Sequence, residues 1–276
     1  MRLILLLIAS LMLTSCSSQF AYRHLDWLIL WYSGDYLDLS RQQEGVFADE
    51  VSNLLNWHSE SELPKYRLQL KAIQNDLNAL PLSSTLIAEH IAQIRGHWQR
   101  TRQQISEQLA PLTVQLSTNQ IEYLFRQLEA RNQERLSEHS QLSPSEIKDD
   151  AIERLEETLI DWLGSIDTMQ SQLMYEFIDK RYDTTVDRVA YLRAYQDQLK
   201  TALSASVEVD KLQILLNNPD AYKSPDYLSK QANNLQHTVE FIRDLSVQLQ
   251  PKQVRHVQNK LQDYINTIDG IIKSRQ

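Results

Sequence analysis

The sequence predicts an all-α protein, an extended multi-helix bundle of about nine to eleven helices. Turn-forming residues are scarce, because the 276 residues include only 5 glycines and 7 prolines, whereas average usage would give about 19 and about 14. Apolar residues recur every three or four positions through most of the chain. No stretch alternates apolar and polar residues with β-branched enrichment. These observations exclude a many-stranded sandwich or barrel.

The first sixteen residues resemble the leader of a bacterial lipoprotein. Arg2 supplies a positive charge, and the apolar run over residues 3–13 is too short to span a bilayer, which needs about 20 residues. The run ends in Leu-Thr-Ser-Cys16, and a small residue before the only cysteine matches the lipobox pattern. The resemblance implies a signal peptide over residues 1–15, diacylglycerol on the Cys16 thiol, and a helical periplasmic domain over residues 16–276. An ordinary secretory signal with a chance cysteine is the alternative.

A lipidated Cys16 would determine where the protein lies and which chemistry it lacks. Several acyl chains, in which each buried methylene contributes about 0.8 kcal/mol, anchor a protein stably to a membrane. Ser17 and Ser18 follow the cysteine, in place of the aspartate that favours inner-membrane retention of lipoproteins. The resemblance therefore implies the periplasmic face of the outer membrane. With its only thiol modified, the mature chain would have no disulfide, cysteine nucleophile or thiolate metal site.

Prolines separate the predicted helices that follow the leader. A proline is tolerated in the first turn of a helix and breaks its interior. All seven fall where an apolar helical period stops or starts: Pro64, Pro81, Pro111, Pro144, Pro219, Pro225 and Pro251. In chain order, the apolar stripes cover residues 70–80, 87–109, 121–136, 147–162, 189–203, 235–245 and 254–268. Residues 217–226 indicate a loop. A subdivision near Pro111 is considered, although no flexible linker favours two independent domains.

Four short segments share the form Leu-Ser-x-x-Gln/Glu, with Gln in place of Ser in the last. They begin at Leu39, Leu116, Leu142 and Leu249. In such a capping box the serine hydroxyl accepts the backbone N–H three residues on, and the Gln or Glu side chain reaches back. The copies also resemble the Leu-Thr-x-x-Gln motif of a family of all-helical periplasmic stress chaperones, which implies a holdase as an alternative function. Those chaperones are smaller, often basic and rich in methionine, whereas this chain is acidic and has 4 methionines.

A second set of matching segments extends over nearly the whole mature chain. The segments are Leu25-Asp26-Trp27-Leu28, Asp35-Tyr36-Leu37-Asp38-Leu39, Trp57-His58, Glu62-Leu63-Pro64-Lys65-Tyr66, Arg131-Asn132 and Trp162-Leu163-Gly164-Ser165. In these segments the chain resembles a family of uncharacterised proteobacterial lipoproteins, classed only as a domain of unknown function. The resemblance implies a lipoprotein with a helical fold and supplies no catalytic residue.

Charge and motifs argue against several kinds of active site. A net charge of −8 disfavours nucleic-acid binding, and the sequence has no phosphate loop, nucleophile elbow, zinc-protease motif or dinucleotide fingerprint. His58 and Glu62 could share a helix face as metal ligands, but Pro64 predicts a helix end with residues 58–61 facing solvent. The acidic run over residues 149–161 is typical of a solvated helix face. We therefore expect no metal and no cofactor.

Arg131 and Asn132 are polar where the apolar stripe containing Leu124 and Leu128 should continue. A polar side chain that is turned toward a core must be hydrogen-bonded, or it costs about 1–3 kcal/mol. The pair is therefore expected to organise a buried polar network. The alternative is that Arg131 and Asn132 line a groove.

Aromatic and basic residues alternate between residues 175 and 195, and Tyr and Arg are enriched at interaction hot spots. The candidate partner-binding residues are Tyr175, Arg181, Tyr182, Arg188, Tyr191 and Tyr195, with helix packing as the alternative. A second aromatic stretch covers residues 20–36, close to the predicted anchor. It could rest on the membrane interface, where Trp and Tyr are favoured, but we expect it to pack into the helical body.

These observations predict a non-enzymatic, lipid-anchored envelope protein that binds an envelope protein or peptide. A periplasmic holdase is the first alternative. An uncharacterised enzyme is the second, because paired carboxylates on helices are not excluded by one sequence.

Overall fold

The chain is described by a computed structural model for residues 21–204 and 209–275, and these residues form eleven α-helices and no strand. The predicted all-α class is thereby confirmed. The predicted leader and Cys16 lie outside the described residues. In chain order the helices are α3 (Leu25–Ser33), α4 (Arg41–Trp57), the π-helix η1 (His58–Glu62), α5 (Leu63–Asp76), α6 (Ser84–Thr113), α7 (Thr118–Ser140), α8 (Pro144–Leu163), α9 (Thr168–Lys180), α10 (Thr185–Ser204), α11 (Val209–Asn217), the 3₁₀-helix η2 (Pro219–Tyr222), α12 (Pro225–Gln248) and α13 (Pro251–Arg275).

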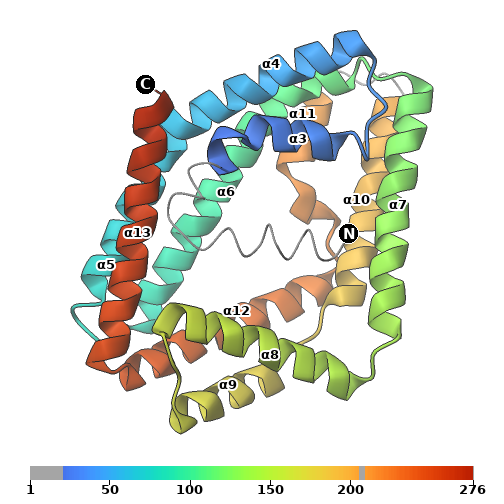
Figure 1. Ribbon diagram of the computed structural model, residues 1–276. Coiled ribbons are helices and arrows are strands. Elements are labelled where there is room, and N and C mark those ends of the chain that lie inside the picture. Colours follow the sequence, from blue (N-terminus) through green and yellow to red (C-terminus); the bar gives the residue numbers. More distant parts are fainter. Residues whose placement is uncertain (1–20, 205–208, 276) are drawn as a thin grey trace, which may run out of the picture.

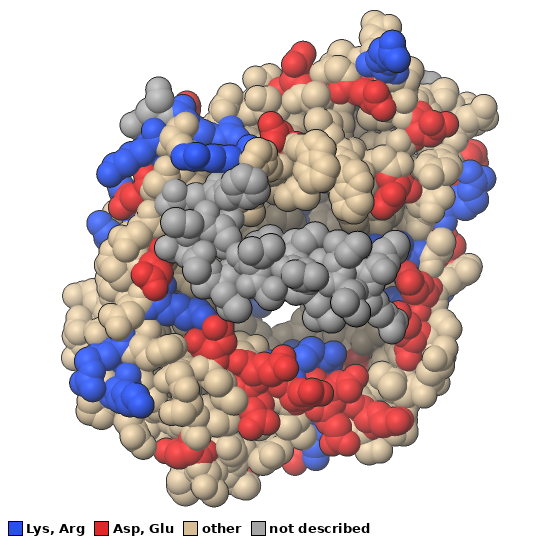
Figure 2. Space-filling view, viewed as in Figure 1, with Lys and Arg blue, Asp and Glu red and all other residues tan. Residues whose placement is uncertain are grey.

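The helices form a four-sided frame (Figure 1). In that view α4 lies along the top, α5 and α13 along the left, α8, α9 and α12 along the bottom, and α7 and α10 along the right. Figure 2 shows that an opening passes through the molecule inside this frame. Long helices that pack mainly on their neighbours along each side therefore replace a single central core.

The buried apolar residues accordingly fall into separate clusters. The largest joins α8, α9 and α12 along the bottom side, where Phe177 and Phe241 stack with ring centroids 4.5 Å apart. A second cluster joins α5 to α13 around Leu63 and Ile268, and a third joins α6, α10 and α11 around Leu212. The bottom and left sides of the frame thus have their own apolar clusters, and burial of apolar surface is the driving force expected for helix pairing. The contacts between α7 and α10 on the right include the ion pairs Glu129–Arg193 and Glu122–Lys200.

The same packing pattern occurs twice along the chain. In the first half α3 packs on α4 and α4 on α6, and in the second half α8 packs on α9 and α9 on α12. The two halves also pack on each other in an equivalent way, because α5 of the first half packs on α13 and α10 of the second half packs on α7. The helices α3, α4, α5, α6 and α7 thus correspond, in that order, to α8, α9, α10, α12 and α13. In the second half α11 and η2 are additional and pack on α6 and α10.

Local sequence signals explain where most helices begin. Complete capping boxes are formed at Ser40, Ser117 and Ser143, as three copies of the short repeat predict. Pro144, Pro225 and Pro251 are the first residues of their helices. Pro111 differs, because it lies inside α6, close to the end of that helix. The subdivision considered near residue 111 therefore does not coincide with a helix boundary.

Over residues 21–204 and 209–275, no helix is both long enough and apolar enough to cross a bilayer.

Candidate functional site

Two glutamines pair where the N-termini of α4 and α7 meet, at a corner that we call junction A. The amide Nε2 of Gln120 donates to Oε1 of Gln43 at 2.7 Å, and Nε2 of Gln43 donates back at 3.4 Å. Each Nε2 also donates to a backbone carbonyl that precedes the other helix. Gln120 donates to the carbonyl of Asp38, before α4, at 2.6 Å, and Gln43 donates to the carbonyl of Gln115, before α7, at 3.3 Å. Each Oε1 accepts the backbone N–H of its own capping serine. The two predicted capping boxes therefore interlock.

An equivalent arrangement, junction B, joins the N-termini of α9 and α13 at the diagonally opposite corner in Figure 1. Gln170 and Gln253 exchange amide hydrogen bonds of 2.9 and 2.8 Å. They also donate to the carbonyls of Gln248 and Ser165. As in junction A, each acceptor carbonyl lies two residues before the cap residue of the other helix. Each Oε1 again accepts the backbone N–H of its own cap residue, Asp167 or Gln250.

Half of junction B was missed by the sequence analysis. The segment Ile166-Asp167-Thr168-Met169-Gln170 has Asp in place of the capping Ser and Ile in place of Leu, so a search for Leu-Ser-x-x-Gln does not detect it. A pattern that allows any apolar residue and any capping residue before x-x-Gln would have found it. The predicted copy at Leu142 has Glu146 in place of Gln, and its capping box lies in an exposed position.

A groove of about 1010 Å³ opens beside junction A, between the start of α4, the end of α6 and the start of α7. Among the described residues that line it, Asp38 alone is charged, and the backbone carbonyl of Asp38 already accepts from Gln120. Glutamine, asparagine, serine and threonine side chains supply hydrogen-bonding groups in the lining. The apolar residues of the wall include Leu37, Val46, Phe47, Leu109, Leu112 and Leu124. Such a lining suits an uncharged, mostly apolar ligand that carries some backbone-like polar groups.

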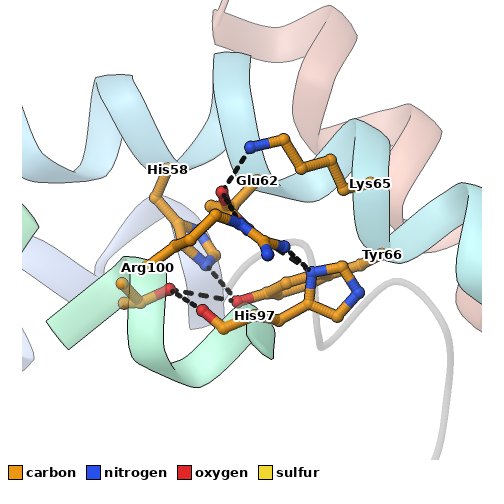
Figure 3. A network of polar contacts seen from close by, with 7 residues as sticks. His58, Glu62, Lys65, Tyr66, His97 and Arg100 are labelled. Carbon is orange, nitrogen blue, oxygen red and sulfur yellow. Dashed lines mark hydrogen bonds and ion pairs between the residues drawn. The ribbon is translucent and has the colours of Figure 1, made fainter. Parts of the chain in front are cut away.

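A network around the buried carboxylate of Glu62 joins η1 and α5 to α6 (Figure 3). The Glu62 side chain has 0% of its surface exposed. Arg100 donates to both carboxylate oxygens, at 2.9 and 3.1 Å, and Lys65 donates to Oε1 at 2.6 Å. Arg100 Nη2 also lies 2.5 Å from Nδ1 of His97. Nδ1 of His97 also lies 3.4 Å from Oε2 of Glu62. Because arginine can only donate and the Arg100 contact is the shorter of the two, we assign Nδ1 of His97 as the acceptor.

The sequence analysis expected a solvent-facing helix end at this place, and that expectation was wrong. The helix runs without a break from α4 through η1 into α5, and Ser59 is buried together with Glu62. The N–H of Leu63 bonds to the carbonyl of His58, five residues earlier, which widens the turn immediately before Pro64. The widened turn allows the helix to pass a proline ring that would clash with an α-helical turn.

The charges of the network favour a fixed ion cluster over proton transfer. Burial alone would raise the pKa of Glu62, but the hydrogen bonds and charges of Arg100 and Lys65 outweigh it and lower the pKa to about 2. Burial lowers the pKa of His97 and also that of His58. Glu62 is therefore ionised at neutral pH and its oxygens are occupied, which makes it a poor general acid or base.

A chain of neutral hydrogen bonds continues from the network toward the N-terminus. The hydroxyl of Tyr22 lies 2.9 Å from Nδ1 of His58, whose Nε2 lies 3.3 Å from the Tyr66 hydroxyl. Tyr66 in turn contacts the hydroxyl of Thr101 on α6. Burial raises the pKa of Tyr22 to about 12, and the Arg275 guanidinium lies over its ring. The first described residues are thus tied to α5, α6 and the end of α13.

The structure divides the predicted partner-binding residues into two groups. Tyr175, Arg181 and Tyr182 are exposed on α9 and the turn after it, and Arg181 lies over the ring of Phe177. Tyr191 and Tyr195 stack on each other on α10 and contact tyrosines of α12 and η2. Arg188 is exposed on α10. Sequence proximity suggested one surface, but only Tyr191 and Tyr195 pack against other helices, whereas the candidate residues of α9, of the turn after it and Arg188 are exposed.

Arg131 and Asn132 are likewise separated. The Asn132 side chain is buried and donates to Oε1 of Gln196 on α10 at 2.8 Å. Arg131 is exposed and donates to the hydroxyl of Tyr36 and to Glu134. Adjacent helical residues point about 100° apart, so only one of the two can face α10. Within the part of the chain that the structure describes, no group of three or more His, Cys, Asp or Glu residues could hold a metal ion.

Comparison with known proteins gives one match. The model of a family of unknown function, DUF6279, matches residues 35–228, which is more than half of the chain. The matched range includes junction A and the Glu62 network and excludes α3 and α13. No curated protein and no solved structure matches the chain.

Proposed function

The chain belongs to the DUF6279 family, for which no function is known, so we propose a function from the residues of the chain itself. The protein is a non-enzymatic, lipid-anchored envelope protein. Its groove at junction A binds an extended apolar segment of another envelope protein. The observation that carries this proposal is the lining of that groove. Its lining combines many apolar side chains with amides and hydroxyls, and its one charged lining residue, among those described, is Asp38.

The chemistry of the groove favours a peptide over other ligands. Phosphates and nucleic acids require basic contacts, and none of the described lining residues is Lys or Arg. An apolar peptide segment also carries backbone N–H and C=O groups that must find partners when they are buried. The amides of Gln42, Gln115 and Asn119 in the lining supply such partners, and apolar side chains of the peptide would cover Val46 and Phe47.

The groove is tested by a photo-crosslinking amino acid placed at Val46, in intact cells. One dominant adduct with one envelope protein is expected. Val46→Arg, with the crosslinker moved to Phe47, should reduce that adduct by at least about tenfold, because an unpaired charge in an apolar groove costs more than about 1.4 kcal/mol. Val247→Arg is the matched control, because Val247 is exposed on α12 and does not line the groove. Equal adducts in both variants would contradict the proposal.

The anchor is tested separately at Cys16. Cys16→Ala should abolish metabolic labelling with a fatty acid and release the protein from the outer-membrane fraction, because the acyl chains supply the membrane affinity. Mature protein is expected on the periplasmic face of that membrane. Undiminished labelling of the Cys16→Ala variant would show that the acyl group is attached elsewhere or that the lipobox interpretation is wrong.

A holdase is the second candidate, and the two interlocked Gln junctions favour it, because they are built from the motif that resembles the stress chaperones. A holdase should suppress aggregation of several unrelated unfolded proteins at near-stoichiometric amounts. It should also give many weak adducts from Val46 in place of one. That combination would replace the specific-partner proposal, whereas a single adduct without aggregation suppression would exclude the holdase.

A further inference from the structure

Helix α3 presents an unusual surface for a short helix of a folded protein. Its sequence, LDWLILWYS, has one charged residue, yet the helix has no buried side chain. Trp27 and Trp31 are 59% and 64% exposed and stack one helical turn apart, with centroids separated by 6.3 Å. Tyr32 is also exposed. The expectation that this aromatic stretch packs into the helical body is therefore wrong for its outer face.

The corresponding helix of the second half shows how different α3 is. Helix α8 packs on α9 as α3 packs on α4, and it buries Leu159 and Leu163 in the largest apolar cluster. The outer face of α8 carries most of the acidic run over residues 149–161, which forms a red band in Figure 2. In the same position of the fold, α3 exposes indole rings instead. An uncompensated aromatic face of this kind marks an interaction surface.

The position of α3 along the chain points to the occupant of that surface. The residues that precede it contain the apolar run over residues 3–13 and then Cys16, and Ala21 is already helical. Cys16 lies five positions before Ala21, and five extended residues span at most about 18 Å. A lipid on Cys16 would therefore hold α3 next to the headgroup region, where Trp and Tyr side chains are most favoured.

We propose that the Trp27–Trp31 face of α3 inserts into the membrane interface and holds the helical frame in a fixed orientation on the bilayer. This inference rests on the proposed lipid anchor and adds a second membrane contact to it. A single acylated residue attaches a protein without orienting it, whereas an interfacial helix adds a second point of contact.

Charge supports one orientation of the frame. Arg23 and Lys273 are exposed near the start of α3 and the end of α13, and the Arg275 guanidinium lies over the ring of Tyr22. Figure 2 shows a basic group at the upper left, near the C-terminus, and the acidic band over α8 at the opposite end, with smaller acidic groups over α4. Anionic headgroups attract the basic side and repel the acidic one. The frame therefore stands with α3 at the membrane and α8 directed away from it.

The test uses the lipidated full chain, reconstituted into vesicles of phosphatidylcholine and phosphatidylglycerol that contain brominated phosphatidylcholine. Bromine quenches indole fluorescence at close contact, and two of the five tryptophans lie on α3. We expect quenching to approach two fifths of the emission and to disappear in the Trp27→Phe/Trp31→Phe variant. Trp98→Phe is the matched control, because Trp98 is 60% exposed on α6, and it should leave the quenching in place.

Flotation of the vesicles in a density gradient separates the two proposals. Flotation without quenching would overturn the docking of α3 and leave the lipid anchor standing, as would quenching that survives in the double Phe variant. The Cys16→Ala chain, which carries no lipid, is measured beside the lipidated chain. Flotation of Cys16→Ala as complete as that of the lipidated chain would overturn the anchor, and quenching in Cys16→Ala would support the docking. Absence of both flotation and quenching for the lipidated chain would overturn both. If α3 were instead covered by a second copy, quenching would be absent and the double Phe variant would change the oligomeric state.

Discussion

Glu62→Ala is expected to lower the free energy of unfolding by about 3 kcal/mol, because it removes the buried anion that balances two cations. Glu62 accepts two hydrogen bonds from Arg100 and one from Lys65, and its side chain is entirely buried. The two cations are each nearly half exposed, so they can turn toward water. That freedom keeps the expected loss at the low end of the range for broken buried ion pairs.

The pH dependence of stability in a second variant, Glu62→Gln, gives an independent check. The pKa of Glu62 is lowered from 4.5 to about 2 in the folded protein. The ion cluster therefore stabilises the fold fully above pH 4.5, and this contribution is lost as the pH falls from 4.5 to about 2. Chemical denaturation of the parent protein and of Glu62→Gln should thus give stabilities that converge over that interval.

The matched control for both measurements is Glu60→Ala. Glu60 lies in the same π-helical turn, but its side chain is exposed. Exposed positions of this kind usually change stability by less than about 0.5 kcal/mol. A loss for Glu62→Ala no larger than that for Glu60→Ala would contradict the structural role assigned to the Glu62 network.

The sequence predicted what depends on local backbone chemistry. Capping boxes at Ser40, Ser117 and Ser143 were recognised because the cap and its partner lie three residues apart. Pro144, Pro225 and Pro251 were correctly predicted to begin helices, because the effect of a proline is also confined to neighbouring residues. Pro111 was misjudged as a boundary, because α6 tolerates the loss of one backbone hydrogen bond near its end.

What the sequence did not predict depends on contacts between distant segments. Nothing near His58 indicates a π-turn, since the widened turn is stabilised by Arg100, which lies 38 residues beyond Glu62. Pairing of Gln43 with Gln120 spans 77 positions. The glutamines could be predicted as caps, but not as partners of each other. The closed frame is likewise a property of exchanged helix pairs, which a periodicity of 3.6 residues cannot specify.

The pairing of glutamines gives the second large effect, and junction B is the place to measure it. Gln170→Ala should cost about 3 kcal/mol, because it leaves the carbonyl of Gln248 and the N–H of Asp167 without this partner and removes both hydrogen bonds that Gln253 exchanges with Gln170, at about 1–3 kcal/mol for each buried group left unpaired. Gln172→Ala on the same helix is the control, since Gln172 is exposed and bonds only to Glu176 among the described residues.

A double-mutant cycle then separates pairing from capping. If Gln170 and Gln253 act as a unit, Gln170→Ala/Gln253→Ala should cost less than the sum of the single losses, with a coupling of about 1–3 kcal/mol. Gln43 and Gln120 should show a smaller coupling, because Gln43 is only half-buried and water can replace part of the pair. Strictly additive losses at junction B would mean that each glutamine serves only its own helix. Helices α9 and α13 would then meet at this corner without gaining stability from the amide pair.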